Sequence, residues 1–372
     1  MNKLPPPYRP KILNIAETIK GGIASYLNIL EHQKTDIGCN FEYLIPESHA
    51  DQLSNKTPFT HRYARGILGV LGLTKEIIRI NKKTNPDILF AHSTFAGLAL
   101  TLATPFLPKN SKTIYCAHGW ASFRSPTRRI YKTIERIISK IPSATINISR
   151  TEHIKSQEIG FSKRCVLIES TVLPSLVKPE SSELFESQQI NILFVGRFDY
   201  QKGYDILCNA IDEINKTSND FIFHFIGDTV LENLEFRKLN YNNVRYHGWI
   251  DNKRIDIYYA SADYLVMPSR CEGFGLCALE AFRNSLPVIA SSNGALPEII
   301  RDHSNGILFD GSAEQLTKTL KRLQELDRST MAQEAYRDYQ TRFSPEKFTE
   351  KYKNLIQSIL NASLRVSTNE NK

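Results

Sequence analysis

Short apolar runs without strict alternation recur along the whole chain and are separated by longer amphipathic stretches. Such runs are typical of parallel strands that helices cover on both faces. The pattern therefore predicts an α/β protein with two doubly wound, Rossmann-like domains. The predicted strands span residues 11–16, 41–45, 87–92, 113–118, 144–149 and 165–169 in the first half, and 191–196, 221–227, 244–248, 264–268, 287–290 and 306–309 in the second.

A polar segment rich in serine, glutamate and proline lies between the two halves, at residues 174–189. We interpret it as a linker between a first domain, 1–173, and a second domain, 190–343. The polar tail 362–372 is predicted to be disordered. A chain of 372 residues is long enough for two such domains.

The most informative stretch is 272–280, Glu-Gly-Phe-Gly-Leu-Cys-Ala-Leu-Glu. It follows a predicted strand, so Glu272 lies on a strand-to-helix turn and Glu280 lies inside the next helix. A carboxylate among apolar neighbours needs hydrogen-bond donors, and a ribose would supply them. The intervening Gly273, Phe274 and Gly275 would let a ligand approach the backbone at a helix N-terminus. The alternative for Glu280 is a structural role, either in an ion pair with an arginine or as the cap of a neighbouring turn.

Two cations follow the predicted strand 191–196. Arg197 and Lys202 share one loop, and Gly203 opens the next helix. Arginine can bind a diphosphate with two hydrogen bonds and lysine acts as a point charge, so the loop suits a diphosphate. Two solvated surface cations are the alternative.

The first half offers two weaker candidates at strand ends. Gly21 and Gly22 follow the strand 11–16 and could bring backbone N–H groups close to a phosphate, although a plain helix-opening turn has the same pattern. His118 follows the strand that begins at 113, and His92 ends another. Ligands bind at the carboxyl ends of the strands in open α/β sheets, so these positions are candidates for function or for structure.

Cysteine usage and charged motifs favour a protein without a metal or cofactor. The six cysteines are scattered without a Cys-x-x-Cys pair or zinc spacing, and no Asp-x-Asp motif occurs. We expect reduced thiols and a cytoplasmic protein, because neither an apolar signal region nor a membrane-spanning run is visible.

The net charge of +8 is concentrated in the first 150 residues, and the remainder is net acidic. The most basic region runs from Arg124 to Lys140, where Glu135 is the single acid. Its isoleucines and its cations recur at helical spacing on different faces, which predicts a basic amphipathic helix. Such a helix can lie on an anionic membrane surface, or it can be an ordinary domain helix with a solvated basic face. A nucleic-acid partner is not expected, because no aromatic series accompanies the charges.

The second half resembles the retaining glycosyltransferases of family 4, of the group 1 type found in bacterial surface polysaccharide synthesis. The resemblance covers residues 190–310 and is looser in the first half, at Gly21-Gly22 and His118-Gly119. Its motifs are Val195-Gly196-Arg197 with Lys202-Gly203, Ile226-Gly227-Asp228, His247-Gly248, Pro268-Ser269, Glu272-Gly273-Phe274-Gly275 with Glu280-Ala281, Pro287-Val288-Ile289-Ala290, and Pro297-Glu298-Ile299-Ile300 with Asn305-Gly306.

The resemblance implies the GT-B fold, with two domains facing across a cleft and a C-terminal helix, at 344–361, that returns to the first domain. It implies a metal-independent hexosyl or N-acetylhexosaminyl transferase. Residue by residue, it assigns donor binding and catalysis to the motif positions. Arg197 and Lys202 would hold the donor diphosphate, Gly21, Gly22 and Gly227 would lie along the donor, Glu280 would bind the ribose, Glu272 with Gly273, Phe274 and Gly275 would hold the sugar, and His118 would sit beside the transferring sugar.

The expected partners are a UDP- or GDP-sugar donor, with UDP-sugar favoured, and a lipid-linked saccharide acceptor at the inner face of the cytoplasmic membrane. The product would be capsule, lipopolysaccharide or exopolysaccharide. The chain departs from the family at Glu169-Ser170-Thr171-Val172, where relatives often carry Asn-Gly-Val-Asp. A sugar-nucleotide epimerase, a soluble small-molecule glycosyltransferase and a non-catalytic sugar-nucleotide-binding subunit are the alternatives.

Overall fold

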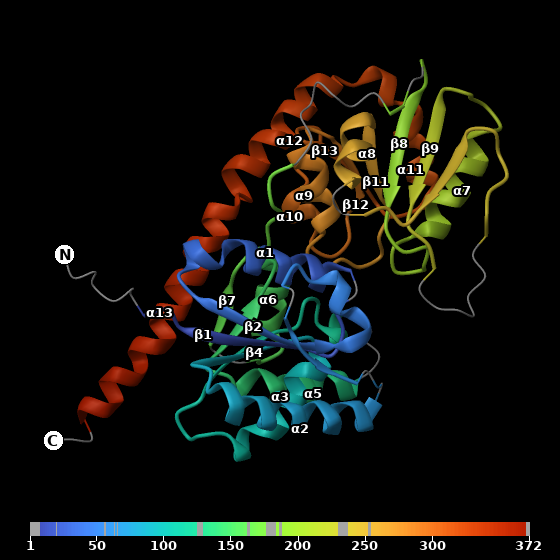
Figure 1. Ribbon diagram of the computed structural model, residues 1–372. Helices are drawn as coiled ribbons and strands as arrows, with labels where there is room; N and C mark the ends of the chain where they lie inside the picture. Colours follow the sequence, from blue (N-terminus) through green and yellow to red (C-terminus); the bar gives the residue numbers. More distant parts are fainter. Residues whose placement is uncertain are drawn as a thin grey trace. The chain divides into compact units, whose positions relative to one another are not determined.

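A computed structural model describes residues 8–19, 21–55, 57–62, 64, 66–124, 129–161, 164–175, 184–185, 188–229, 237–251 and 254–369 (Figure 1). The chain divides into two compact units. Unit 1 comprises Met1–Thr171 with Pro345–Lys372, and unit 2 comprises Val172–Ser344.

Unit 1 is built on a parallel sheet with the strand order β3-β2-β1-β4-β5-β6-β7 within the described residues. The short edge strand β3 was not predicted, because its three residues are too few to show an apolar run. The strands are β1 (Lys11–Ala16), β2 (Asn40–Pro46), β3 (Phe59–His61), β4 (Ile88–His92), β5 (Lys112–Cys116), β6 (Ala144–Asn147) and β7 (Cys165–Leu167).

Helices cover both faces of this sheet. Helices α2, α3 and α5 lie side by side on one face, and α1 packs against the C-terminal helix α13 (Figure 1). The helices of the unit are α1 (Gly22–Ile37), α2 (Gly66–Thr84), α3 (Thr94–Ala103), α4 (Ala121–Arg124), α5 (Arg129–Lys140), α6 (Arg150–Glu158) and α13 (Pro345–Asn369), with 3₁₀ turns η1 (Glu47–Gln52) and η2 (Thr104–Phe106).

Unit 2 contains a second parallel sheet, with the order β10-β9-β8-β11-β12-β13 in the part that is described. A cluster of buried aromatic and aliphatic side chains, including Phe194, Phe223 and Phe225, fills its core. The elements are β8 (Ile190–Val195), α7 (Tyr204–Ile214), β9 (Phe221–Ile226), β10 (Val244–Gly248), α8 (Ile255–Ser261), β11 (Tyr264–Met267), α9 (Leu276–Arg283), β12 (Val288–Ser291), α10 (Leu296–Ile299), β13 (Gly306–Phe309), α11 (Ala313–Lys321), η4 (Leu323–Glu325) and α12 (Arg328–Arg342).

Each sheet has one position at which the strand order reverses. In unit 1 it lies between β1 and β4, and in unit 2 it lies between β8 and β11. Loops that leave neighbouring strands at such a point turn to opposite faces of the sheet, which opens a crevice at the carboxyl ends. The loops after β1, β4, β8 and β11 therefore have the best position for a ligand.

The described part of the predicted linker, 174–189, belongs to unit 2 and is packed onto it. The Phe185 ring stacks on the His224 ring with centroids 3.6 Å apart, and Ser175 Oγ donates to Asn284 Oδ1 at 2.8 Å. The polar composition of the segment concealed this aromatic contact, which depends on a strand far away in sequence. Along the chain, the boundary between the two units lies between Thr171 and Val172.

The C-terminal helix is longer than predicted. Helix α13 runs to Asn369, although the sequence predicted its end at 361 and a disordered tail at 362–372. No glycine or proline interrupts residues 361–369, so the backbone hydrogen bonds can continue. Residues 370–372 lie outside the described residues. The helix belongs to unit 1, where Phe348 and Tyr352 pack against Tyr26 of α1.

Candidate active site

A buried ion pair joins the loops after β8 and β11 in unit 2. Lys202 Nζ lies 2.6 Å from Glu272 Oε1, and Ser269 Oγ donates to the same oxygen at 2.8 Å. Only 20% of the Lys202 side chain and 8% of the Glu272 side chain are exposed. The structure thus brings together two residues that are 70 positions apart, at the point where the strand order of the second sheet reverses.

Glycines allow these loops to approach each other. Gly203 begins α7 with φ of 68°, and a Cβ there would lie 1.9 Å from the carbonyl oxygen of Pro268. Gly227 follows β9 with φ of 128°, and its Cβ would lie 1.9 Å from the carbonyl oxygen of Gly196. Any other residue would push the β8–α7 loop away from the neighbouring strand ends. Gly227 therefore shapes the Arg197 loop from the adjacent strand.

Arg197 lies on the same loop and is held by two neighbours that the sequence analysis missed. Its Nη2 donates to Gln201 Oε1 at 3.2 Å and is 3.1 Å from Asp199 Oδ2. Asp199 Oδ1 also accepts from the backbone N–H of Lys202 at 2.9 Å. With 41% of its side chain exposed, Arg197 can still reach a ligand. In the sequence, only their position as polar residues between Arg197 and Lys202 could have indicated that Asp199 and Gln201 hold Arg197.

The charges of this group are set by the surrounding residues. Burial is the largest single effect and lowers the pKa of Lys202, but the Glu272 carboxylate and Cys277 together raise it more, so the net pKa lies above its ordinary value and the amine is cationic at neutral pH. Burial and the nearby Glu280 raise the pKa of Cys277 to about 12. That thiol is therefore protonated and is no nucleophile. The arrangement can neutralise an anion, with a carboxylate alongside that can accept hydroxyl hydrogen bonds.

Glu280 lies on α9, two turns after Glu272. Its Oε2 accepts a hydrogen bond of 2.7 Å from the hydroxyl of the buried Tyr259. The structural ion pair considered for Glu280 is not formed among the described residues: the nearby Arg283 pairs instead with Asp256 at 2.7 Å. Tyr259 could not be identified from the sequence, because it comes from a different helix.

The turn between the two glutamates places a helix N-terminus beside the ion pair. Gly275 caps α9 with φ of 110°, and Phe274 is buried against Phe343. Behind Glu272, a Cβ at Gly294 would lie 2.6 Å from the Glu272 carbonyl oxygen. Gly273, Phe274 and Gly275 therefore form a tight turn whose N–H groups lie at the start of α9.

In unit 1, the predicted Gly21-Gly22 turn opens α1 at the carboxyl end of β1. Gly21 is the N-cap with φ of 73°, and its carbonyl accepts from the backbone N–H groups of Ala24 and Ser25. Apart from its chain neighbours and its own helix, no atom of the described residues lies within 4 Å of the position that a Cβ at Gly21 would take. The left-handed backbone requires glycine, and the space above it is open to a ligand.

His118 follows β5 in a left-handed conformation with φ of 54°. Its ring packs edge-on against Tyr26, with centroids 4.5 Å apart, and its Nε2 lies 2.9 Å from Nδ1 of His92. Burial lowers the pKa of His118 to about 3, so the ring is neutral at physiological pH. The two predicted histidines, at the ends of β4 and β5, are thus in direct contact.

The residues that follow His118 are held by hydrogen bonds to Asn147 and Glu135. Trp120 is buried and its Nε1 donates to Asn147 Oδ1 at 2.9 Å. The carboxylate of Glu135 accepts from the backbone N–H groups of Ala121 at 2.7 Å and Ser122 at 3.1 Å. Glu135, the single acid of the basic segment, is therefore buried and holds this loop. Its position among cations in the sequence did not indicate this role.

The predicted site residues accordingly form two groups. In unit 2, the structure brings together Arg197, Lys202, Glu272 and the turn at 273–275. Gly227 packs against the loop that carries Arg197, and Glu280 lies on α9, two turns after Glu272. In unit 1, Gly21, Gly22 and His118 lie at the carboxyl edge of the first sheet. Each group is described within its own unit.

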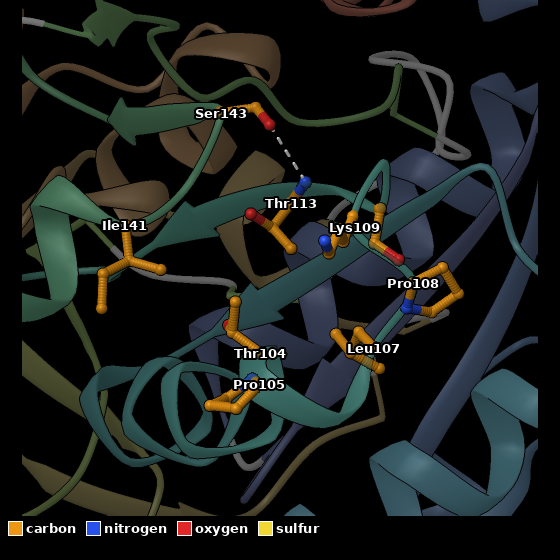
Figure 2. Close-up of a pocket in the computed structure, with 9 residues that line it drawn as sticks. Thr104, Pro105, Leu107, Pro108, Lys109, Thr113, Ile141 and Ser143 are labelled. Carbon is orange, nitrogen blue, oxygen red and sulfur yellow. Dashed lines mark hydrogen bonds between the residues drawn. The ribbon is translucent and has the colours of Figure 1, made fainter.

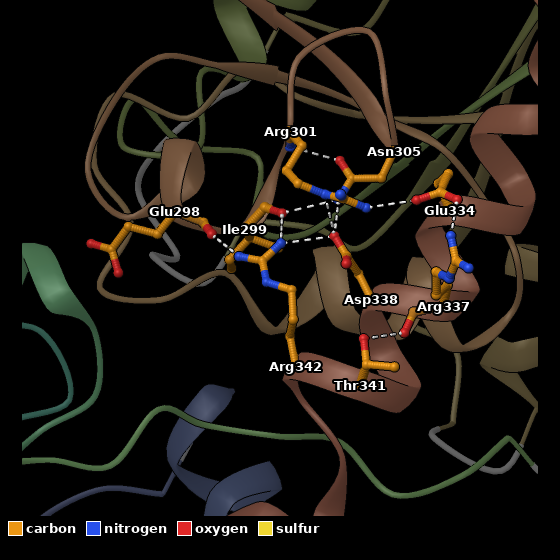
Figure 3. A network of polar contacts seen from close by, with 9 residues as sticks. All are labelled: Glu298, Ile299, Arg301, Asn305, Glu334, Arg337, Asp338, Thr341 and Arg342. Atoms are coloured by element: carbon orange, nitrogen blue, oxygen red, sulfur yellow. Dashed lines mark hydrogen bonds and ion pairs between the residues drawn. The ribbon is translucent and has the colours of Figure 1, made fainter.

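The family-like segment 297–306 has a structural role. Asp338 on α12 is buried and accepts from Arg301 Nε at 2.8 Å, from Asn305 Nδ2 at 2.7 Å and from Arg342 Nη1 at 2.7 Å (Figure 3). Arg342 also donates to the Ile299 carbonyl at 3.3 Å. This network attaches α10 and the loop before β13 to α12, which supports the turn behind Glu272.

A pocket of about 330 Å³ lies elsewhere in unit 1, near the amino ends of β5 and β6 (Figure 2). It is the opposite edge of the sheet from His118, and none of the predicted site residues lines it. Its lining residues are Thr104, Pro105, Leu107, Pro108, Lys109, Ser111, Thr113, Ile141 and Ser143.

Two features are absent from the described residues. No group of three or more histidine, cysteine, aspartate or glutamate side chains there is arranged to hold a metal ion. None of the helices in that part of the chain combines the length and the apolar content that a membrane span requires.

The sequence of the chain matches one family of known proteins. Residues 178–340 match the model of the glycosyl transferases group 1. A protein of Klebsiella pneumoniae, described as an uncharacterized 41.2 kDa protein in the cps region, is 36% identical over 80% of this chain and 86% of its own length. An O-antigen biosynthesis glycosyltransferase of Escherichia coli is 26% identical over 76% of this chain and 78% of its own length.

Solved structures show the same fold. Sucrose-phosphate synthase from Thermosynechococcus elongatus matches with a TM-score of 0.78 and 18% identity, over 95% of this chain and all of that one. HepE of Anabaena, solved in complex with UDP-glucose, matches with a TM-score of 0.74 and 17% identity, over 94% of this chain and all of that one. Both units thus have the α/β architecture of the GT-B glycosyltransferases. The chain belongs to the glycosyl transferases of group 1 and is a glycosyltransferase.

Proposed function

We propose that this enzyme is a retaining glycosyltransferase that moves a sugar from a nucleotide-diphospho-sugar to a lipid-linked saccharide in the synthesis of a cell-surface polysaccharide. The observation that carries the proposal is the buried Lys202–Glu272 pair beside Arg197, at the reversal point of the second sheet. Two cations there suit a diphosphate, and the carboxylate suits sugar hydroxyls. A UDP-sugar is the favoured donor, since HepE was solved with UDP-glucose, and a GDP-sugar is the second choice.

The chemistry follows from where charge develops. As the bond from sugar to diphosphate breaks, the leaving group gains negative charge, which Arg197, Lys202 and the N-terminus of α9 would stabilise. Glu272 and the backbone of residues 273–275 would hold the sugar, and Glu280 the ribose. By its resemblance to family 4, the enzyme would deliver the acceptor to the same face of the sugar, with a donor phosphate oxygen taking the proton. This scheme needs no metal.

Replacing Glu280 by alanine is expected to weaken binding of the donor nucleotide by about 10- to 100-fold, because a charged hydrogen-bond acceptor is worth about 1.5–3 kcal/mol. The measurement is a thermal-shift panel of UDP-, GDP- and ADP-sugars on both proteins. Bound ligand stabilises the folded state in proportion to its excess over the dissociation constant. One nucleotide class should raise the wild-type midpoint, and Glu280→Ala should lose most of that rise.

The matched control is Glu213→Ala, which removes an exposed glutamate of α7 that pairs with Lys216. It should keep the full ligand-induced shift. A folded wild type that responds to none of the nucleotide sugars would contradict the assignment of the donor site.

The acceptor side of the proposal rests on one face of unit 1. On α5, Ile130 is 65% exposed and Ile137 is 54% exposed, beside the exposed Arg129, Lys132 and Lys140. If α5 were an ordinary domain helix, its isoleucines would be packed inward, yet only Ile134 and Ile138 contact the core. Exposed isoleucines among cations favour contact with an anionic lipid surface.

Helix α2 lies on the same face of the sheet, with α3 between it and α5 (Figure 1). Its first turn exposes Ile67 and Leu68, at 78% and 80%, and its later turns expose Lys75, Lys82 and Lys83. In a parallel α/β sheet the helices run back against the strands, so the first turns of α2 and α5 lie at the carboxyl edge. Ile67, Leu68 and Ile130 are thus at the edge that carries His118, where a lipid-linked acceptor has to arrive, and Ile137 lies two turns further along α5.

The double variant Ile130→Glu/Ile137→Glu is expected to lower binding to anionic vesicles by at least about tenfold. An isoleucine that becomes buried in the lipid contributes about 1.5–3 kcal/mol at most, and the new carboxylates are repelled by the anionic headgroups. The measurement is co-sedimentation with vesicles of phosphatidylglycerol and phosphatidylethanolamine at several salt concentrations. Binding by the wild type should fall as salt rises, because cations contribute to it.

Ile154→Glu is the matched control, because Ile154 is 55% exposed on α6, outside the surface formed by α2 and α5. It should bind vesicles like the wild type. Equal binding by all three proteins, or no binding by any of them, would overturn the membrane-facing surface and favour an acceptor in solution.

A further inference from the structure

The pocket at the amino ends of β5 and β6 has no part in the mechanism above, yet its volume of about 330 Å³ suits a small ligand (Figure 2). It lies between the loop that leads from η2 into β5 and the loop that joins α5 to β6. Backbone hydrogen bonds hold both loops: Ser143 N donates to the Thr113 carbonyl at 2.8 Å, and Ser111 N donates to the Pro108 carbonyl at 2.9 Å. The pocket is therefore formed by the fold itself and does not depend on a ligand.

Two hydroxyl groups that line the pocket have no hydrogen-bond partner among the described residues. Thr113 is only 6% exposed, and although its backbone N–H donates to Ser143 Oγ at 3.3 Å, its own hydroxyl has no partner within the described part of the chain. Ser111 is half-buried, and the described residues leave its hydroxyl without a partner as well. A buried hydroxyl normally has a hydrogen-bond partner, and a polar group that enters the pocket can supply one.

The surroundings of the pocket are basic. Lys109 lines the pocket, Lys112 begins β5 and Lys140 ends α5. None of these three amines forms an ion pair with a residue that the structure describes. The two segments that build the pocket, 104–113 and 136–145, contain neither aspartate nor glutamate. The charge of this edge therefore favours an anionic ligand.

Two negative features lie at the same edge and are already compensated in part. Asp87, just before β4, accepts hydrogen bonds from the Tyr8 hydroxyl at 2.6 Å and from the Lys11 backbone N–H at 2.7 Å. The C-terminal ends of α3 and α5 carry partial negative charge, but Thr104 Oγ1 donates to a carbonyl in the last turn of α3 at 3.0 Å, and Lys140 lies in the last turn of α5. Carbonyl groups at helix ends also accept hydrogen bonds from hydroxyl groups. The ligand that fits this edge therefore combines an anion with hydroxyl groups.

Exposed apolar side chains lie beside the pocket. Phe106, between two lining residues, is 67% exposed, and Ile141, which lines the pocket, is 40% exposed. Ile130, Ile137 and Ile141 follow one another at intervals of seven and four residues, so they share one side of α5 and its extension. This stripe connects the pocket with the membrane-facing surface proposed above. A free anion makes no use of exposed apolar side chains, whereas a lipid offers them its acyl region.

We propose that the pocket is a headgroup site for an anionic glycerophospholipid whose headgroup is phosphoglycerol. Lys109 binds the phosphate, the hydroxyls of Ser111 and Thr113 bond to the glycerol, and Phe106 and Ile141 enter the acyl region. This inference rests on the membrane-facing surface of the proposed function, and it adds recognition of one headgroup to the general attraction of anionic lipid. It involves residues of unit 1 alone.

The first test is co-sedimentation of the wild-type protein with two kinds of vesicle. One contains phosphatidylglycerol in phosphatidylethanolamine, and the other contains phosphatidylserine at the same molar fraction. The two anionic lipids carry the same net charge, so general electrostatic attraction is equal for both. We expect about tenfold tighter binding to the phosphatidylglycerol vesicles, the effect of hydrogen bonds to a charged group. Equal binding to both vesicles would overturn the headgroup site.

The second test removes the cation of the pocket. Lys109→Gln should lower the preference for phosphatidylglycerol from about tenfold to nearly none. The matched control is Lys132→Gln, which removes the same charge from the exposed side of α5, outside the pocket. It should weaken binding to both vesicles alike and keep the preference. An unchanged preference in Lys109→Gln would contradict the proposal.

The third test fills the pocket without changing its charge. Ser111→Leu keeps the backbone bond to Pro108 and places a larger side chain in the pocket, so the preference for phosphatidylglycerol should disappear. Asn110→Leu is the control, because Asn110 is exposed at the adjacent position and does not line the pocket. It should keep the preference. A thermal midpoint close to that of the wild type shows that each variant is folded, and a folded Ser111→Leu that retains the preference would refute the site.

The same measurements separate this inference from the proposed function. A wild type that binds both vesicles equally keeps the membrane-facing surface and loses the headgroup site, whereas a wild type that binds neither loses both. The donor assignment is tested by the thermal-shift panel and does not enter these measurements. Finally, sn-glycerol 3-phosphate is added to the wild type in solution. If it raises the thermal midpoint of the wild type but not of Ser111→Leu, while both vesicles bind equally, the pocket takes a soluble phosphate ester and the lipid assignment is wrong.

Discussion

Replacing Lys202 by methionine is expected to lower kcat for sugar transfer by about 10²–10³-fold, the usual effect of removing one preorganised group that stabilises developing negative charge. Lys202 is cationic and largely buried, with its amine 2.6 Å from Glu272. A buried cation is not screened as a surface lysine is, and it is already in place before the leaving diphosphate gains its charge. Methionine preserves most of the side-chain volume.

The measurement is release of nucleoside diphosphate from the donor that the thermal-shift panel identifies. Lys216→Met provides the matched control, because Lys216 also lies 2.6 Å from a glutamate but is exposed on the surface of unit 2. It should retain full activity. If Lys202→Met is folded and transfers sugar at the wild-type rate, the diphosphate is bound elsewhere and the proposed donor site is wrong.

Replacing Asp338 by alanine is expected to lower the local stability of unit 2 by about 3 kcal/mol, at the lower end of the cost of breaking a buried ion pair. The carboxylate accepts hydrogen bonds from Arg301, Asn305 and Arg342, and its loss leaves all three donors without their shared acceptor. Hydrogen–deuterium exchange should show peptides from α10 and α12 opening about 10²-fold more often.

Glu334→Ala is the control on the same helix, since Glu334 also binds Arg301, at 2.9 Å, but at the rim of the network (Figure 3). Partly exposed pairs of this kind contribute about 1 kcal/mol or less. Equal exchange in the two variants would show that the buried position of Asp338 is not what stabilises this region. Loss of α10 would also loosen the turn behind Glu272, so donor binding should weaken in Asp338→Ala.

Much of the fold was predictable because its signals are local. The apolar runs that predicted strands correspond to β1, β2 and β4–β13, and both sheets are parallel as the continuous runs indicated. The motif loops were predictable for the same reason: in a parallel sheet, segments that follow different strands meet at one edge. That rule alone predicts that Lys202 and Glu272 lie in the same site.

The sequence could not identify hydrogen-bond partners that are distant along the chain and become neighbours only in the folded structure. Tyr259 beneath Glu280, Asp338 beneath Asn305 and Asn14 behind His92 all come from distant elements, and each is an unremarkable residue in its own segment. Asn14 offered the one visible hint, as a polar residue inside an apolar strand. A buried polar group needs a partner, but the sequence does not say which one.

The isoleucines of α5 show most clearly which properties the sequence determines and which depend on the tertiary structure. Their helical spacing, alone, determined that residues 129–140 form an amphipathic helix with a basic side. The same spacing is compatible with a face packed into the core and with a face left open. Only the tertiary structure decided that Ile138 is buried while Ile130 and Ile137 are exposed. Periodicity records which residues share a face, whereas burial depends on whether neighbouring elements cover that face.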